Sequence, residues 1–195
     1  MGVQERRERE KQGIREEILA AARALFVQEG YENVSIRKIA ERIEYSPGTI
    51  YLYFQDKADI LAQISEETFA RLERKLAAIN RDTSIEPLER LRSGLRAYIR
   101  FGLEHPHRYV LTFMRGSIQC PAGSRCFGEL MKGVGFAMEA GQIEDGDVVE
   151  ISQALWAGSH GVASLLVTCT DFPFVEHGRL VERMLEIMME GVRKR

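Results

Sequence analysis

Apolar residues recur along this chain every three to four positions, which is the spacing of one face of an α-helix. The first such segment runs from about Gly13 to Glu29 and is ended by Gly30. Tyr31 is expected to fold back onto Phe26, as in a Schellman cap. The apolar face of this segment consists of Ile14, Ile18, Leu19, Ala22, Leu25 and Phe26. Every other strong period is also helical, so the pattern predicts an all-α protein.

The helical pattern divides the chain into a head of short helices, a long connecting helix and a body of longer helices. The predicted domains are an N-terminal arm and helix-turn-helix head over residues 1–56, the connecting helix over 57–80, and a helical body over 81–195. Glycine and proline predict a loop over Arg115–Ser124 and a turn over Gly141–Gly146. Body helices are expected at about Pro87–Glu104, Pro106–Met114, Arg125–Ala140, Asp147–Cys169 and Phe174–Val192.

Local signals in residues 34–61 predict two short helices joined by a tight turn and followed at once by a third helix. Ser35, Ser46 and Asp56 each stand at an expected N-cap, because their side chains can accept a hydrogen bond from a backbone N–H. Pro47 follows at the first helical position, where a missing N–H costs nothing. Two helices joined in this way form a helix-turn-helix, whose second helix enters the major groove of DNA.

The second short helix has an outer face that is unusual for a solvated surface. Ile50 and Phe54 are four residues apart and should face the core, so the other faces carry Pro47, Gly48, Thr49, Tyr51, Leu52 and Tyr53. Small residues allow close approach, and hydroxyl groups can bond phosphates or base edges. An apolar helix buried on several sides could have the same composition. Lys57 favours the DNA interpretation, because a lysine in the next helical turn can bind a phosphate there.

These residues resemble the tetracycline-repressor (TetR) family of bacterial transcription regulators over residues 14–61. The resemblance is carried by Ile18, Ala21, Ala22, Leu25, Phe26, Gly30, Tyr31, Ser35, Ile36, Ile39, Ala40, Ser46, Pro47, Gly48, Thr49, Ile50, Tyr51, Leu52, Tyr53, Phe54 and Lys57. It implies an all-helical homodimer with N-terminal DNA-binding heads and a C-terminal body that binds a ligand and dimerises. One position departs from the pattern, since members commonly have glycine in the turn where this chain has Glu44.

The expected DNA contacts come from the caps, the outer face of the second helix and the basic residues nearby. They are Ser35, Arg37, Lys38, Ser46, Pro47, Gly48, Thr49, Tyr51, Leu52, Tyr53 and Lys57, with Thr49 and Tyr51 the most direct. Net charge gives little help, because the chain carries −2 and residues 1–60 hold ten Lys and Arg against eleven Asp and Glu. DNA binding must therefore depend on where the positive charges lie. The alternating Arg and Glu of the N-terminal arm are more typical of an exposed helix than of a minor-groove tail.

The penultimate helix contains Trp156 followed, after three residues, by His160 and Gly161. This Trp-x3-His-Gly spacing resembles the C-terminal domain of a subset (WHG) of TetR-family regulators. Apolar and small residues on this helix and the last one suit a four-helix dimer seam. The expected seam residues are Gly158, Val162, Leu166, Leu180, Met184, Ile187 and Met188. Alternatively, these residues only complete the core of the single chain.

Aromatic and methionine side chains concentrate in the central helices of the body. They suit an apolar ligand cavity, although a plain core has the same composition. The candidate pocket residues are Tyr98, Phe101, His105, Tyr109, Phe113, Met114, Phe136, Trp156 and His160. An effector is expected to be mostly apolar, with an orienting hydrogen bond from His105, His160 or Tyr98. His160 beside Trp156 is more typical of a structural histidine than of a ligand-binding one.

Composition adds mainly exclusions. The absence of an apolar run that could span a bilayer, together with a charged N-terminus, predicts a cytoplasmic protein with no membrane partner. Cys120, Cys126 and Cys169 form an odd set with no CxxC spacing, and the spacing of His105, His107, Cys120 and Cys126 matches no standard zinc pattern, so no metal or cofactor is expected. A thiol switch at Cys120 and Cys126 is the alternative. No nucleophile-base-orienter set stands out, which argues against an enzyme.

We therefore expect a homodimeric, sequence-specific regulator that binds a palindromic operator in double-stranded DNA. It would act as a repressor that a small-molecule effector releases from the operator. The alternative is a TetR-shaped dimer whose body binds a partner protein, with DNA binding serving for localisation.

Overall fold

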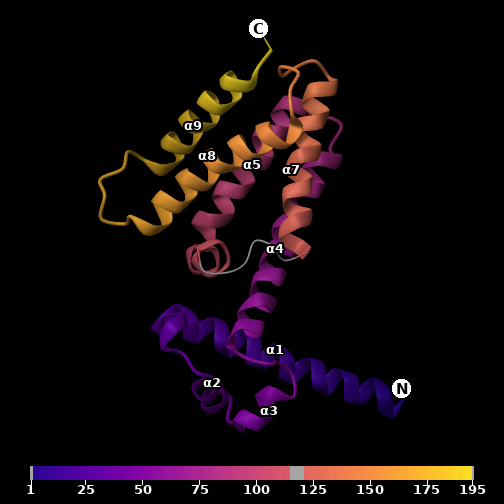
Figure 1. The fold of residues 1–195 in the computed structure, drawn as a ribbon, viewed down its shortest axis with the longest axis vertical. Helices are drawn as coiled ribbons and strands as arrows, with labels where there is room; N and C mark the ends of the chain where they lie inside the picture. The colour runs from indigo at the N-terminus through magenta and orange to yellow at the C-terminus, as the bar shows by residue number, and fades with distance from the viewer. Residues whose placement is uncertain (1, 115–120, 195) are drawn as a thin grey trace. The chain divides into compact units, whose positions relative to one another are not determined.

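The computed structural model of the protein describes residues 2–114 and 121–194, with the side chains of Val3 and Met114 excepted. All regular elements in these ranges are helical (Figure 1). Within them, residues Ile143 and Arg193 also form an isolated antiparallel β-bridge. The elements are α1 (Val3–Glu29), η1 (Tyr31–Asn33), α2 (Ile36–Arg42), α3 (Pro47–Tyr51), α4 (Lys57–Arg81), α5 (Pro87–Glu104), α6 (Pro106–Tyr109), η2 (Val110–Met114), α7 (Pro121–Glu139), α8 (Val148–Thr168) and α9 (His177–Val192). The predicted all-α fold is confirmed.

The chain divides into two compact units. The first, called the head below, comprises Met1–Glu67 and Leu111–Ser117. The second, called the body, comprises Thr68–Val110 and Ile118–Arg195. The division falls inside α4, so the first part of this helix belongs to the head.

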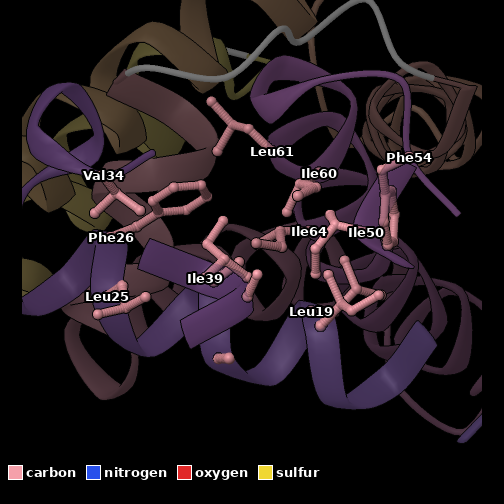
Figure 2. Packing of buried hydrophobic residues seen from close by; sticks show 14 of the residues in the cluster. Leu19, Leu25, Phe26, Val34, Ile39, Ile50, Phe54, Ile60, Leu61 and Ile64 are labelled. Atoms are coloured by element: carbon pink, nitrogen blue, oxygen red, sulfur yellow. The ribbon is translucent and has the colours of Figure 1, made fainter. Parts of the chain in front are cut away.

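An apolar core holds the short helices of the head in place (Figure 2). Ile18 of α1, Ile39 of α2, Ile50 of α3 and Ile64 of α4 are all fully buried in it. Each such side chain contributes about 1.5–3 kcal/mol by leaving water. Ile50 and Phe54 point into this core, as the spacing predicted, and so fix which face of α3 is turned outward.

The three predicted N-caps of the head are present. Ser35 Oγ accepts a hydrogen bond from the Lys38 N–H at 3.2 Å, and Ser46 Oγ accepts one from the Thr49 N–H at 3.2 Å. Asp56 accepts one from the Asp59 N–H at 2.8 Å. Each cap satisfies a backbone donor that the first helical turn leaves unpaired, which explains where α2, α3 and α4 begin.

The turn between α2 and α3 is a Schellman motif. The Tyr45 N–H donates to the Ala40 carbonyl at 3.0 Å, and the Glu44 N–H donates to the Glu41 carbonyl at 3.3 Å. Glu44 has a φ of 60°, and no other non-glycine residue in the described ranges has a positive φ. The tight turn of the helix-turn-helix therefore uses a backbone conformation that glycine adopts at lower cost.

The end of α1 differs from the predicted Schellman cap. Gly30 has φ 83° and ψ 146°, which lies outside the left-handed helical region, and the chain continues into the short helix η1. Tyr31 nevertheless folds back onto Phe26, with the ring centroids 5.1 Å apart. The aromatic contact was predicted correctly, but the cap geometry was not.

Three helix boundaries also differ from the prediction. The first helix begins at Val3 rather than near Gly13, because exposed side-chain pairs such as Arg6–Glu10 support an extra length of helix. α7 begins at Pro121, so the predicted loop is wrong for residues 121–124, while residues 115–120 lie outside the described ranges. α9 begins at His177 rather than at Phe174. There the Glu176 carboxylate accepts the backbone N–H groups of residues 178 and 179 at 2.8 and 2.7 Å.

In the body, α5 packs against α7, α8 and α9. Its Gly102 lies so close to the Tyr109 ring that an added Cβ would be 2.9 Å from a ring carbon, so only glycine allows this approach. Past Tyr109 the chain forms the π-helical turn η2. Among the described residues, no helix has the length and apolar character needed to cross a membrane.

Candidate functional site

The outer face of α3 is exposed and uncharged. Tyr51 is 57% exposed and Leu52 is 78% exposed, the highest value among the large apolar side chains that the structure describes. Ser46, Pro47 and Gly48 are exposed as well. This excludes the alternative of a helix buried on several sides.

Gly48 lies at the centre of this face, since successive residues are rotated by about 100° and Tyr51 and Leu52 fall on either side of it. An added Cβ at Gly48 would meet only Ser46 Oγ, at 3.5 Å, which is an ordinary contact. The head therefore has room for a side chain at this position. Because Gly48 has no side chain, the backbone of α3 is uncovered here, and another molecule can approach it closely.

Two of the predicted contact residues are less accessible than expected. Thr49 is half-buried, and its hydroxyl lies 3.0 Å from Ser46 Oγ. Tyr53 is half-buried and packs against the head core. Tyr51 and Leu52 therefore dominate the accessible outer face, whereas the sequence had placed Thr49 beside Tyr51 as the most direct contact.

The basic residues expected to bind phosphate all have partners within the head. Arg37 pairs with Glu41 at 2.9 Å, and Lys38 pairs with Glu29 and donates to the Asn33 carbonyl.

Lys57 Nζ donates to the Tyr31 carbonyl at 2.8 Å and lies 4.2 Å from the centroid of the Tyr31 ring. This contact ties η1 to the start of α4. Burial, followed by the nearby charges of Glu32 and Asp56, raises the pKa of Tyr31. The Lys57 ammonium has three N–H donors, and the bond to the Tyr31 carbonyl uses one of them. A further contact between Lys57 and a DNA phosphate is compatible with this geometry and stays a prediction.

Sequence reasoning missed two residues beside the outer face. Arg42, in the last turn of α2, is exposed and forms no ion pair with the residues that the structure describes. Tyr45 is partly exposed next to the α3 N-cap. Their positions directly before the second helix of a helix-turn-helix are the signal that could have identified them.

In the body, four of the candidate pocket residues form a hydrogen-bonded cluster. Tyr98 Oη and Tyr109 Oη lie 2.9 and 2.7 Å from His160 Nδ1, and Tyr109 Oη also lies 3.2 Å from the His160 carbonyl oxygen. Trp156 Nε1–H donates to Tyr98 Oη at 3.3 Å. The Tyr109 and His160 rings are stacked, with centroids 5.6 Å apart. We call these four residues the tyrosine–histidine cluster.

The tyrosine–histidine cluster is electrically neutral near pH 7. Burial lowers the pKa of His160, which favours the uncharged imidazole with Nδ1 as an acceptor. Burial also raises the pKa of Tyr109 to about 12. The pKa of Tyr98 is raised as well, by burial and then by neighbouring Tyr109. These bonds supply His160 with hydrogen-bond partners within the body, and its structural role stays a prediction.

The other candidate pocket residues are not all brought together. Phe101 is buried on α5, and His105, whose ring centroid lies 5.3 Å from that of Phe101, is exposed. Phe136 is 38% exposed, with the Arg90 guanidinium 5.3 Å from its ring centroid. Phe113 is buried but belongs to the head unit, and the Met114 side chain lies outside the described part of the structure.

The candidate dimer residues differ in how far the single chain buries them. Val162 and Leu166 are buried within the single chain, and an added Cβ at Gly158 would lie 2.7 Å from Met188 Sδ. The close approach at Gly158 is thus between α8 and α9 of the same chain. Ile187 is 58% exposed. The remaining seam candidates, all half-buried, are Leu180, Met184 and Met188.

Within the described residues, no group of three or more His, Cys, Asp or Glu side chains is placed to hold a metal ion. Cys126 is buried and Cys169 is exposed, both as free thiols, and Cys120 lies outside the described residues.

Curated relatives match less than half of the chain. The transcriptional repressor AcnR of Corynebacterium diphtheriae is 30% identical over 95 residues, covering 49% of this chain and 43% of the relative. The transcriptional repressor KstR of Mycobacterium tuberculosis is 35% identical over 75 residues, covering 38% of this chain and 32% of the relative. The matched region thus spans less than half the length of these curated relatives.

Solved structures match the whole fold. A tetR-family regulatory protein from Rhodococcus RHA1 has a TM-score of 0.74 at 20% identity, covering 93% of this chain and 97% of that one. The repressor SmeT of the Stenotrophomonas maltophilia efflux pump SmeDEF has a TM-score of 0.73 at 24% identity, covering 92% and 90%. At these identities the likeness shows the fold alone.

Family models match both parts of the chain. Residues 18–64 match the model described as bacterial regulatory proteins of the tetR family. Residues 91–190, more than half of the chain, match the model described as a tetracyclin repressor-like C-terminal domain. The finer assignment to the Trp-x3-His-Gly subset stays a prediction. With a helix-turn-helix head, a helical body and both matches, the chain belongs to the TetR family of bacterial regulatory proteins.

Proposed function

We propose that this protein is a sequence-specific transcriptional repressor that binds a palindromic operator as a homodimer. The observation that supports it best is the exposed outer face of α3, where Gly48, Tyr51 and Leu52 offer a shallow, uncharged surface. A solvated helix would carry charged residues there, whereas a helix in the major groove needs close approach and apolar or hydroxyl contacts. The two recognition helices of the dimer would read half-sites about 34 Å apart.

The first test is selection of binding sites from a random duplex DNA pool with the full chain. We expect a palindromic site to be enriched. The affinity for this site should then fall in Gly48→Ala, because a methyl group at the centre of the face would hold α3 away from the bases. This variant should fold normally, since the added Cβ meets only Ser46 Oγ.

Gly128→Ala provides a matched control, because an added Cβ at this α7 position meets no atom within 4 Å. It should leave operator affinity unchanged. Failure of any sequence to be enriched at low salt would contradict operator binding. Unchanged affinity in Gly48→Ala would show that α3 does not approach DNA through this face.

Dimerisation is proposed to use the exposed apolar surface of α8 and α9. Leu165 on α8 and Ile187 on α9 are both more than half exposed, so each helix carries an apolar side chain that a partner could cover. A dimer would bury these side chains and supply the second recognition helix. Ile187→Glu should therefore shift the protein to monomers in sedimentation and weaken binding to the full palindrome. An unchanged dimer would place the interface elsewhere.

The effector is proposed to be a mostly apolar, uncharged small molecule that binds in the body beside the tyrosine–histidine cluster. The cluster offers aromatic surface and hydroxyl groups but no charge, so a charged ligand would find no partner within it.

Trp156 is the single tryptophan of the chain and donates to Tyr98 in the cluster, so its fluorescence reports directly on this site. Apolar compounds that change Trp156 fluorescence should also release operator DNA, and Tyr98→Phe should weaken both effects in parallel. A compound that releases the operator without changing the fluorescence would place the effector site elsewhere.

A further inference from the structure

The recognition helix lacks the side chains that usually read purines. From Tyr45 to Phe54 the sequence contains no Arg, Lys, Asn, Gln, Asp or Glu. Guanine is commonly read by a bidentate Arg or Lys, and adenine by a bidentate Asn or Gln. Direct contacts from this helix must therefore depend on hydroxyl groups and on apolar surface.

Leu52 is the most prominent apolar group on this surface. Leu52 is 78% exposed, more than any other large apolar residue that the structure describes. The head core does not use it, since that core consists of other residues such as Ile50 and Phe54. The packing of the head core therefore does not require leucine at this position.

Thymine is the base that presents an apolar group in the major groove, its C5-methyl. Leu52 and the Tyr51 ring flank Gly48, whose small size lets the helix come close enough for a side chain to touch a base edge. We propose that Leu52, supported by Tyr51, recognises thymine in each operator half-site by burying its C5-methyl. This inference rests on the proposed binding of α3 in the major groove.

The test removes single methyl groups from the DNA. Each thymine of the selected operator is replaced in turn by 2′-deoxyuridine, which keeps the base pair and lacks only the C5-methyl. We expect one thymine position in the half-site to be sensitive. Replacing it in one half-site should lower the affinity about fourfold, the factor expected for one buried methyl group, and replacing it in both half-sites should lower the affinity about fifteenfold. Fluorescence anisotropy with the full chain at fixed salt measures these affinities.

Leu52→Ala connects the effect to the residue. This variant should bind the thymine and deoxyuridine operators equally at that position, because the partner of the methyl is gone. Its high exposure means that folding should be unaffected, which circular dichroism checks. The control is Val149→Ala, which shortens an exposed apolar side chain far along the sequence, on α8. It should keep the full preference for thymine.

The outcomes separate this inference from the proposed function. An operator bound with equal affinity at every thymine-to-deoxyuridine change would overturn the role of the methyl group and leave operator binding intact. A preference for thymine that persists in Leu52→Ala would overturn the role of Leu52. Failure to select any operator would instead contradict the proposed function on which both depend.

Discussion

At the scale of single residues, Glu44 carries a conformational cost that the fold does not require. It occupies the left-handed position of the Schellman motif after α2. α7 ends in the same motif, with the Gln142 N–H bonded to the Ala137 carbonyl at 2.9 Å, but there the left-handed residue is Gly141, with φ 66°. The chain thus has two equivalent left-handed positions. Gly141 fills one with the residue that this conformation favours, whereas Glu44 fills the other with a residue that it disfavours.

Glu44→Gly should stabilise the protein by about 1 kcal/mol. A left-handed conformation costs a side-chain-bearing residue about 1–2 kcal/mol, and the greater freedom of glycine in the unfolded chain offsets part of that gain. Urea unfolding measures the change. Gly141→Ala, where an added Cβ meets no atom within 4 Å, should lose a similar amount for the same reason. No gain in Glu44→Gly would mean that the carboxylate makes a compensating contact.

Lys57 has a structural contact that its position in the sequence does not reveal. Loss of its hydrogen bond to the Tyr31 carbonyl and of its contact with the Tyr31 ring should destabilise the head by about 1–2 kcal/mol in Lys57→Ala. If Lys57 also binds phosphate, the slope of log affinity against log salt should fall by about one unit. Lys75→Ala, an exposed lysine on the same helix, should change neither quantity. Lower stability with an unchanged slope would leave Lys57 a purely structural role.

At the scale of elements, local signals were enough to place most helices. α5 begins and ends where the sequence predicted, because Pro87 fixes one end and the His105–Pro106 pair the other. The caps of the head were predictable because each cap involves residues three positions apart. Contacts between distant residues were not, such as the bond from Lys57 to Tyr31.

The outward faces of α8 and α9 were the least predictable part of the candidate site. α8 carries apolar or small residues on several sides. Its face with Val162 and Leu166 is buried within the single chain, whereas its face with Leu165 is exposed. Periodicity alone could not distinguish these two faces. The tyrosine–histidine cluster, by contrast, was partly predictable. Its members stood out as polar groups in apolar helices, although only the fold shows that they meet.

A group of ion pairs joins α5 to α9. Arg96 donates to Glu182 at 2.6 and 2.9 Å, and Arg92 donates to Glu182 at 3.0 Å. Hydrogen bonds from Arg96 are the main reason that the pKa of Glu182 falls from its ordinary 4.5 to about 2. The folded state therefore binds this proton less tightly than the unfolded chain does. The resulting stabilisation is fully present above about pH 4.5 and is lost as pH falls toward 2.

Glu182→Gln should remove this pH-dependent term. We expect a loss of about 1 kcal/mol at neutral pH, the upper end for partly exposed pairs, and a flatter dependence of stability on pH between 4.5 and 2. Thermal unfolding across this pH range measures both. Glu186→Gln breaks only the neighbouring exposed pair with Arg183 and should leave the pH dependence in place. A wild-type profile in Glu182→Gln would show that other carboxylates dominate the acid response.

At the scale of the whole molecule, the head is built from two separate stretches of the chain. The second of them, which begins at Leu111, lies between two stretches that belong to the body. Tyr109 bonds to His160 in the body, whereas Leu111, two residues later, is buried in the hydrophobic core of the head. The backbone between them is part of the π-helical turn η2, an irregularity that often marks functional sites. An effector that displaced Tyr109 would therefore act two residues away from a side chain on which the packing of the head depends. If an effector binds beside the tyrosine–histidine cluster as proposed, this segment would give it a short covalent route to the head.

Leu111→Ala tests whether this segment supports the head. Truncation of a buried leucine should cost about 2–4 kcal/mol, and the loss should fall on the head, since Leu111 belongs to the hydrophobic core of the head. Hydrogen exchange should then accelerate in the amides of α2 and α3. Leu185→Ala, which empties an equally buried site on α9, should accelerate exchange in body helices instead. If Leu111→Ala affected only the body, η2 would not support the head.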